Sequence, residues 1–206
     1  RSRAETMTKQ NPSMTNLDRE ASAAKSLFLG TILEENISPY PEFGADERET
    51  LAMMIDAIDK FMEPKAQSYR EFDVSGVQPE EYIESLREMG LFGLIIPEEY
   101  GGLGLSNSAY ARVIQQSSSY DGSTSLTIGA HSSIGMKGIL LFGTEAQKKR
   151  YLPKLASGEH IAAFCLTEAG AGSDAASVKT HAVKNADGTW TLHGEQIWIT
   201  NGAFAE

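Results

Sequence analysis

The amino-acid sequence predicts an α+β protein, in which an all-α helical N-terminal domain is followed by the start of a β domain. Apolar residues recur at helical spacing through about the first three quarters of the 206 residues. Beyond Gly158 this pattern gives way to short β-compatible runs separated by turn residues. We therefore divide the chain into a leader over residues 1–38, a helical domain over 39–160 and an incomplete β domain over 161–206.

The leader is predicted to be partly disordered. Residues 1–19 are polar, rich in Ser, Thr and Asn, and show no periodicity. A short apolar patch follows over residues 23–33. Pro39 and Pro41 then favour an extended stretch, because a proline biases the residue before it away from the helical conformation.

Two helices are predicted next. The first begins near Asp46, whose spacing to Glu49 suits an acidic cap, and it ends at Pro64. Its apolar stripe consists of Leu51, Met54, Ile55, Ile58, Phe61 and Met62. The second helix follows the same pattern over "QPEEYIESLREMG", with Pro79 near its first turn and Gly90 as its C-cap.

The remaining helical part is less regular. Residues 91–105 are too interrupted by Gly and Pro for a helix, so we expect an apolar loop packed between helices. Helical spacing returns over residues 110–114 and again over 129–143. Thr144 is predicted to cap a further helix, which Pro153 closes.

Four β-compatible runs follow, over residues 160–167, 179–183, 190–194 and 196–200. The turn between the second and the third contains Asp187 and Gly188, a pair that strongly favours a hairpin. The chain is thus predicted to continue from helices into a β domain.

Composition limits the partners. The sequence has 28 acidic and 18 basic residues, a formal net charge of −10, so its long-range field repels nucleic acid and anionic membrane surfaces. Cys165 is the single cysteine and cannot form an internal disulfide.

The sequence contains no stretch that resembles a secretory signal or a membrane-spanning run, so we expect an intracellular, reducing setting. Both ends of the chain look cut, because it begins with Arg1 and stops at Glu206 within a strand and turn.

The most informative stretch is "FCLTEAGAGSDAAS", in which a glycine-rich loop directly follows a strand-like run. Gly170, Gly172 and Ala175 match the form GxGxxA of dinucleotide-binding loops. That fingerprint requires a crossover helix, yet the next residues indicate strand, turn and strand. Two interpretations remain open from the residues alone: a nest of backbone N–H groups that binds a phosphate, or a plain surface loop.

"FCLTEAGAGSD" followed by "WITNG" resembles the acyl-CoA dehydrogenase family. The resemblance runs from about Pro39 to the end of the chain. "LREMGLFGLIIPEEYGGLG" is similar to the helical N-terminal domain of that family. "GAHSSIGMKGILLFGTEAQKKRYLPKLASGE" is most similar to its very-long-chain branch. The departures are small: Ala169 stands where many relatives have Pro, and Phe164 where some have Tyr.

The resemblance implies a fold with a helical domain, a β-barrel-like middle domain and a C-terminal four-helix domain that is absent here, with FAD at their junction. The implied FAD-binding residues are Phe164, Cys165, Leu166, Thr167, Gly172, Ser173, Trp198, Ile199 and Thr200. Strand backbone at residues 164–166 would line the flavin, and Thr167 would hydrogen-bond its pyrimidine edge.

Further roles follow from the same resemblance. Gly172 and Ser173 would approach the FAD pyrophosphate, and Ser173 would also lie near the thioester arm of the substrate. Trp198 would pack against the isoalloxazine ring with Ile199 beside it. The Thr200 hydroxyl would point at flavin N5.

Other chemically suggestive residues are assigned structural roles. We expect Cys165 to be a small buried strand residue rather than a nucleophile, and His131 to be a packed or capping side chain. No residue pair has metal-ligand spacing, so no metal site is predicted. Glu168 is not assigned as a base, since the resemblance implies a catalytic glutamate from the absent C-terminal domain.

The resemblance implies an oxidoreductase that converts a long-chain fatty acyl-CoA to the trans-2-enoyl-CoA. Its electrons would pass to an electron-transfer flavoprotein, in the bacterial cytoplasm or mitochondrial matrix. We expect a homo-oligomer, dimer or tetramer, with any peripheral membrane contact confined to the absent C-terminal region. Two alternatives stay open: an acyl-CoA oxidase that uses oxygen, and a non-catalytic assembly module. These 206 residues alone are expected to be inactive.

Overall fold

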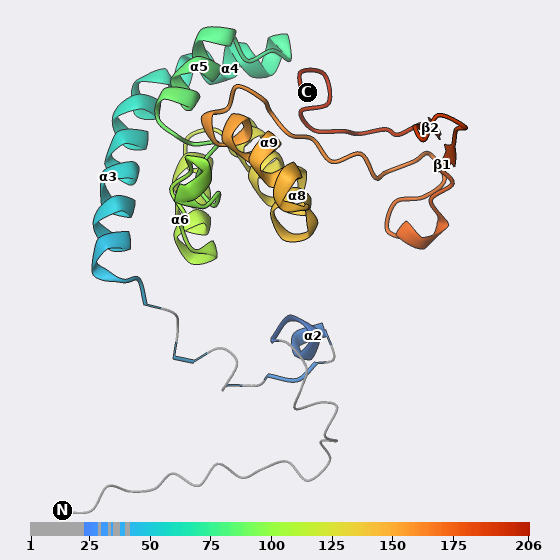
Figure 1. The fold of residues 1–206 in the computed structure, drawn as a ribbon. Helices are drawn as coiled ribbons and strands as arrows, with labels where there is room; N and C mark the ends of the chain where they lie inside the picture. The colour runs from blue at the N-terminus through green and yellow to red at the C-terminus, as the bar shows by residue number, and fades with distance from the viewer. Residues whose placement is uncertain (1–22, 29, 33, 35–37, 40–41) are drawn as a thin grey trace, which may run out of the picture. The chain divides into compact units, whose positions relative to one another are not determined.

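The computed structural model (Figure 1) describes residues 23–28, 30–32, 34, 38–39 and 42–206. It separates into two units, residues 1–42 and residues 43–206. In the first unit, α2 (Ala23–Phe28) falls in the predicted apolar patch. The disorder predicted for residues 1–19 lies outside the described residues.

The second unit begins with helices and ends with a small sheet, so the predicted α+β class is confirmed. Its helices are α3 (Ala45–Met62), α4 (Ala66–Ser75), α5 (Glu80–Glu88), α6 (Asn107–Ser118), α7 (Gly122–Gly129), α8 (Lys137–Phe142) and α9 (Glu145–Ser157). The strands are β1 (His181–Lys184) and β2 (Trp190–His193). Whether residue 160 separates two domains stays a prediction.

The apolar stripe predicted for the first helix is confirmed in α3. Leu51, Ile58 and Met62 are buried, and the other members pack at the edge of the core. The predicted acidic cap is wrong, because the N-cap residue is Gly44 and makes no side-chain cap bond. Asp46 instead lies inside the first turn, where its charge favours the positive end of the helix dipole.

The loop over residues 91–105 packs between helices as predicted. Leu91, Phe92, Leu94 and Ile96 are almost fully buried, although they lie in turns. Pro79 immediately precedes α5, and Gly90 follows it with φ 71°, as expected for a residue that ends a helix. The loop therefore belongs to the core.

The core lies among α3, α5, α6, α7, α9 and this loop. Helix α6 packs against both α3 and α7, and α8 packs against α9. The largest fully buried side chains are Phe92, Ile58, Met62, Leu86, Leu91, Leu94, Ile96, Ile128, Met136, Leu152, His131 and Val113. A π-helical turn, Ala130–Gly135, joins α7 to α8 and carries His131 into this core.

The predicted start of α9 is confirmed and its predicted end is wrong. Thr144 forms a full capping box with Gln147. Pro153 does not close the helix, which continues to Ser157. The buried Leu152 and Leu155 hold this last turn against the core, which offsets the backbone hydrogen bond that a proline removes.

We expect Gly158→Ala to lower the free energy of unfolding by roughly 2–4 kcal/mol. Gly158 ends α9 with φ 75°, and an added Cβ would lie 2.6 Å from the Phe92 ring and 2.8 Å from Arg87 Cγ. Gly76, which ends α4 with φ 68° and open space around it, provides the control. Gly76→Ala should cost only about 1 kcal/mol in urea unfolding. Equal losses would contradict the crowding at Gly158.

The β part is smaller than predicted. β1 and β2 pair antiparallel around the Asp187–Gly188 turn, so the hairpin is confirmed. Residues 160–167 and 196–200 are not strands, and the second run is interrupted by Trp198, whose φ is 58°. Figure 1 shows that they lead to and from the hairpin. The hydrogen bond between their backbones is that from Ile197 N–H to the Thr167 carbonyl at 2.8 Å, too little for a ladder.

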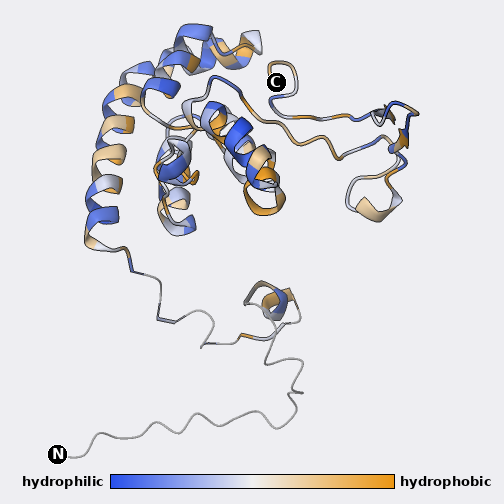
Figure 2. Cartoon of the chain, in the orientation of Figure 1, coloured by the Kyte–Doolittle hydropathy of each residue, from blue (hydrophilic) through white to orange (hydrophobic). Residues whose placement is uncertain are grey.

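Several large apolar side chains remain exposed in the second unit. Figure 2 shows hydrophobic residues on α8 and on the hairpin. Leu141 and Phe142 are exposed on α8, and Trp190 and Leu192 on β2. Among the described residues, no helix has both the length and the apolar character that crossing a bilayer requires.

Candidate functional site

The two segments that carry the sequence motifs lie next to each other. The hydrogen bond from Ile197 N–H to the Thr167 carbonyl joins residues 164–173 to residues 198–200. Phe164, Cys165, Gly172, Ser173, Trp198 and Thr200 are exposed, and Leu166, Thr167 and Ile199 are half-buried. The bond places the two motif segments side by side at Thr167, and each of the predicted site residues keeps part of its surface accessible.

Glu168 fixes the loop between the motif and the hairpin. Its carboxylate accepts hydrogen bonds from the N–H groups of Lys179 at 2.9 Å and Thr180 at 2.7 Å, and from the Thr180 hydroxyl at 2.5 Å. The hydrogen bond from the Thr180 hydroxyl has the largest effect and the two N–H groups add to it, so the pKa of Glu168 lies below its usual value. An ionised carboxylate with three bound donors suits a structural role better than that of a base.

The glycine-rich loop leaves backbone donors free. Within the described part of the chain, the N–H groups of Gly172 and Ser173 have no hydrogen-bond partner. A Cβ added at Gly172 would meet no atom within 4 Å, and its φ is not left-handed. Neither crowding nor backbone conformation among the described residues thus requires a glycine here. The close approach of an anionic ligand to the backbone would require one.

Trp198 has a conformation that the described residues do not explain. Its side chain is 86% exposed, and its backbone has φ 58°, which is rare for a large side chain. The hydroxyls of Thr167 and Thr200 also make no hydrogen bond to any described residue. A flat ring that covered the Trp198 side chain and accepted hydrogen bonds would account for its exposure and for the two unused hydroxyls.

Asn201 is a residue of this site that sequence reasoning missed. It is buried with φ 67°, and its side-chain amide donates to the carbonyls of Thr127 at 3.0 Å and Ala162 at 3.3 Å. The Asn201-Gly202 pair was a usable signal, because Asn tolerates the left-handed conformation. Its distant partners could not be predicted from that pair.

Next to Asn201 lies a cavity of about 700 Å³, between α4, α5, the start of α7 and residues 200–206. Its apolar wall includes Tyr69, Phe72, Ile83, Ile161 and Phe204. Its charged lining includes Asp73, Glu80, Asp121, Glu159, Glu206 and Arg87. Because Arg87 already pairs with Glu80 and Glu84, this lining disfavours an anionic ligand, and the apolar wall offers a surface for an apolar group.

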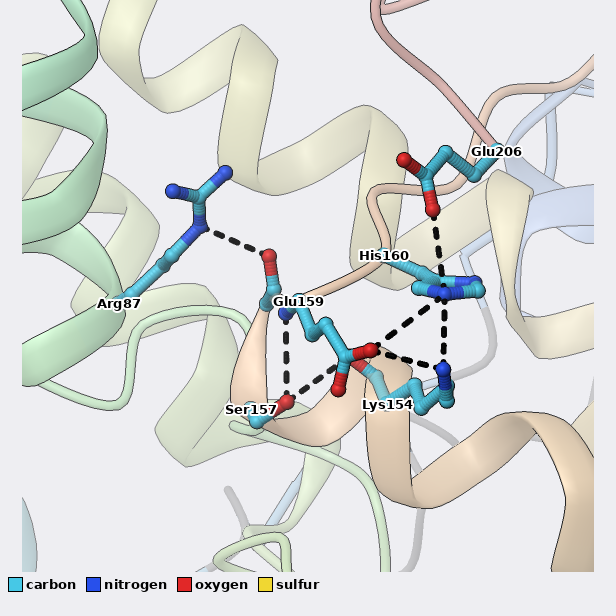
Figure 3. A network of polar contacts seen from close by, with 7 residues as sticks. Arg87, Lys154, Ser157, Glu159, His160 and Glu206 are labelled. Carbon is cyan, nitrogen blue, oxygen red and sulfur yellow. Dashed lines mark hydrogen bonds and ion pairs between the residues drawn. The ribbon is translucent and has the colours of Figure 1, made fainter.

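Figure 3 shows the polar contacts at one edge of this cavity. Lys154 pairs with Glu159 at 2.7 Å, and His160 Nε2 lies 3.1 Å from a Glu206 carboxylate oxygen. These contacts surround residues 158–160, where α9 leads into the extended segment. Exposed pairs of this kind add little stability. We therefore assign these contacts a local structural role, in directing the backbone from α9 into the next segment.

The structure corrects one sequence prediction and confirms another. Cys165 is exposed rather than buried, because the extended run that contains it has no sheet partner to cover it. His131 is fully buried within the π-helical turn, as predicted for a packed side chain. In the residues that the structure describes, no three His, Cys, Asp or Glu side chains cluster as a metal site would require.

Comparison with protein families gives two adjacent matches. Residues 47–159 match the acyl-CoA dehydrogenase N-terminal domain, and residues 163–206 match the acyl-CoA dehydrogenase middle domain. The two motif segments discussed above lie within the second match.

Individual proteins resemble the chain over most of its length. It is 44% identical over 187 residues to the mitochondrial very long-chain specific acyl-CoA dehydrogenase of Macaca fascicularis, covering 90% of this chain but 28% of that relative. An acyl-CoA dehydrogenase from Bacillus anthracis, solved in complex with FAD, is 42% identical with a TM-score of 0.67. That match covers 80% of this chain and 28% of the solved chain.

A second solved structure is similar. A chain in the structure of the electron transferring flavoprotein of Acidaminococcus fermentans is 36% identical, with a TM-score of 0.72, covering 80% of this chain and 42% of that one. The chain therefore spans less than half of each of these three proteins.

Proposed function

The chain belongs to the acyl-CoA dehydrogenase family, and we propose that the protein containing it oxidises a long-chain fatty acyl-CoA to the trans-2-enoyl-CoA. The observation that carries the proposal is the Ile197–Thr167 hydrogen bond, which brings the two motif segments together. Both segments present donors that the described residues leave unused. The very long-chain relative supports a long-chain substrate.

The unused donors fit FAD as the cofactor. The N–H groups of Gly172 and Ser173 would hold its pyrophosphate, and the Thr167 hydroxyl would bind the pyrimidine edge of its ring system. Bound FAD would supply the acceptor for the hydride that leaves the β carbon of the substrate. The similar chain from Bacillus anthracis, which is complexed with FAD, supports this choice.

The other motif residues would shape the reacting face. The exposed Trp198 ring would pack against the cofactor and exclude water from that face. The Thr200 hydroxyl would donate a hydrogen bond where negative charge develops, and Ser173 would contact the thioester arm. Because Glu168 is committed to three donors, we do not assign it as the base that removes the α proton. As the resemblance implies, we place that base in the C-terminal part of the full-length protein.

The apolar wall of the cavity next to Asn201 is our candidate for binding part of the acyl chain. The cavity volume of about 700 Å³ is within the usual range for ligand pockets, and Thr200 lies on its lining. The acidic lining would repel the phosphates of coenzyme A. We therefore place the acyl end of the substrate, rather than its nucleotide end, in this cavity.

We further propose that the reduced protein passes its electrons to an electron-transfer flavoprotein, as a homo-oligomer in the bacterial cytoplasm or mitochondrial matrix. Similarity to a chain in the Acidaminococcus fermentans structure supports that acceptor. The full-length protein should reduce an electron-transfer flavoprotein in the presence of palmitoyl-CoA with little hydrogen peroxide. Peroxide equal to the substrate consumed would instead indicate an oxidase.

We expect Gly172→Val in the full-length protein to weaken FAD binding about tenfold, because a branched side chain would block the approach of the pyrophosphate to the backbone. FAD titration of the apoprotein, followed by flavin fluorescence, measures the affinity. Gly170→Val is the matched control, since Gly170 also has open space around it but no assigned contact.

The two variants distinguish the outcomes. A large effect at Gly172 with little at Gly170 supports the assigned contact, while equal effects would point to general disruption of the loop. A full-length wild-type protein that binds no FAD would contradict the proposed cofactor.

A further inference from the structure

We infer that His131 and Asn201 are positioning residues that together hold Ala162 and thereby place both motif segments on the helical part of the chain. We call these two side chains the Ala162 clamp. Its effect on FAD rests on the proposed function, whereas its effect on the two segments does not.

His131 holds the N–H side of Ala162. The Ala162 N–H donates to His131 Nδ1 at 3.0 Å, and His131 Nε2 lies 3.1 Å from the Phe92 carbonyl. Because Nδ1 accepts, the neutral ring must carry its proton on Nε2 and donate it to Phe92. The Phe92 ring packs edge-on against the imidazole at 5.2 Å between centroids. The buried imidazole therefore links the apolar loop to the first motif segment.

Asn201 holds the carbonyl side of the same residue. One side-chain amide group donates to the Ala162 carbonyl at 3.3 Å and to the Thr127 carbonyl at 3.0 Å. Thr127 belongs to α7, which is also the helix that leads into the turn carrying His131. Both polar backbone groups of Ala162 are thus bound by side chains, and each of those side chains has a second bond to the helical part.

The clamp lies just before the first motif segment and just after the second. Ala162 is two residues before Phe164, and Asn201 directly follows Thr200. The π-helical turn approaches closely here, since a Cβ added at Gly135 would lie 2.7 Å from Ala162 Cβ. Phe164 and Cys165, which follow the clamp, are exposed, and the other backbone bond beside it joins the Glu206 N–H to the Ile161 carbonyl at 3.3 Å. Loss of the clamp should therefore loosen both segments.

Two substitutions at His131 separate its two bonds. His131→Asn keeps an acceptor near the position of Nδ1 and loses the bond to Phe92. His131→Gln places an amide near the position of Nε2 and loses the bond to Ala162. Asn201→Gly removes the other side chain of the clamp. Glycine adopts φ 67° without strain, so any effect of this variant reflects the lost hydrogen bonds.

Hydrogen–deuterium exchange of the full-length protein without FAD measures the clamp directly. We expect His131→Gln to speed exchange of the Ala162 amide on the order of tenfold, with His131→Asn close to wild type. Asn201→Gly should speed exchange over residues 197–203. Unchanged exchange in both His131→Gln and Asn201→Gly would overturn the inference, as would equal changes in the two His131 variants.

FAD titration of the same proteins tests the consequence for the site. His131→Gln and Asn201→Gly should weaken FAD binding about tenfold, and His131→Asn much less, because a loosened segment must be ordered on binding. Equal FAD affinity in all four proteins would overturn the positioning role. If the wild-type protein binds no FAD, the proposed function fails, and the exchange pattern still decides whether the clamp exists.

Discussion

Thr200→Ala in the full-length protein is expected to slow reduction of the bound flavin by acyl-CoA by up to ~10²-fold while FAD stays bound. The Thr200 hydroxyl makes no hydrogen bond to any described residue, so its donor is available. The residue after Thr200, Asn201, is bound to the Thr127 carbonyl of α7, which restricts where the Thr200 hydroxyl lies. A preorganised donor of this kind stabilises charge that develops in the transition state, and removing it affects rate more than binding.

The measurement is stopped-flow loss of oxidised-flavin absorbance after mixing with palmitoyl-CoA. Thr200→Ser is the matched control, because it keeps the hydroxyl and removes only the methyl group. We expect Thr200→Ser to remain within a few-fold of wild type. A wild-type rate in Thr200→Ala would show that the hydroxyl does not act on the reaction.

The parts of the fold that sequence reasoning predicted depend on neighbours a few residues apart. The α3 stripe, the Thr144 cap and the Asp187–Gly188 turn are all set by spacings within one or two turns of chain. Pro153 was misjudged because its local preference is outweighed by burial of Leu152 and its neighbours in the core. Tertiary packing, which a local pattern does not report, decides such cases.

Two of the predicted strands did not form, because composition does not report whether a partner strand is present. Residues 160–167 have the composition of a strand, but a strand forms only where another strand supplies its hydrogen bonds. Composition could not reveal that one backbone bond, from the Ile197 N–H to the Thr167 carbonyl, would join this run to residues 196–200. The same absence of a covering strand left Cys165 exposed, against the prediction.

The motif residues of the candidate site could be located from the resemblance, whereas their supports could not. Asn201 and Thr127 are 74 positions apart in the sequence, and His131 and Ala162 are 31 positions apart. No spacing rule connects residues at such separations. The buried His131 was expected to be a packed side chain, and its two hydrogen bonds became visible only in the fold.

The last prediction concerns how stability depends on pH. Burial lowers the pKa of His131 from its ordinary value of 6.5 to about 4, against the smaller opposing effect of backbone hydrogen bonds. No charged side chain of the described residues contributes to this shift. Between these two pKa values the unfolded chain binds a proton that the folded chain does not. The stabilisation from neutral His131 is therefore complete above pH 6.5 and is lost as the pH falls towards 4.

The whole effect is about 3 kcal/mol, of which about 1.5 kcal/mol should be lost by about pH 5.5. Urea unfolding at about pH 7.5 and about pH 5.5 measures it, with His131→Asn and His131→Gln as controls that cannot titrate. His160, His181 and His193 are common to all three proteins, so they cancel when the pH dependences are compared. The wild type should lose more stability than either variant over this range. An equal loss in all three proteins would show that His131 is not buried in its neutral form, and would remove the tautomer on which its bonds to Ala162 and Phe92 depend.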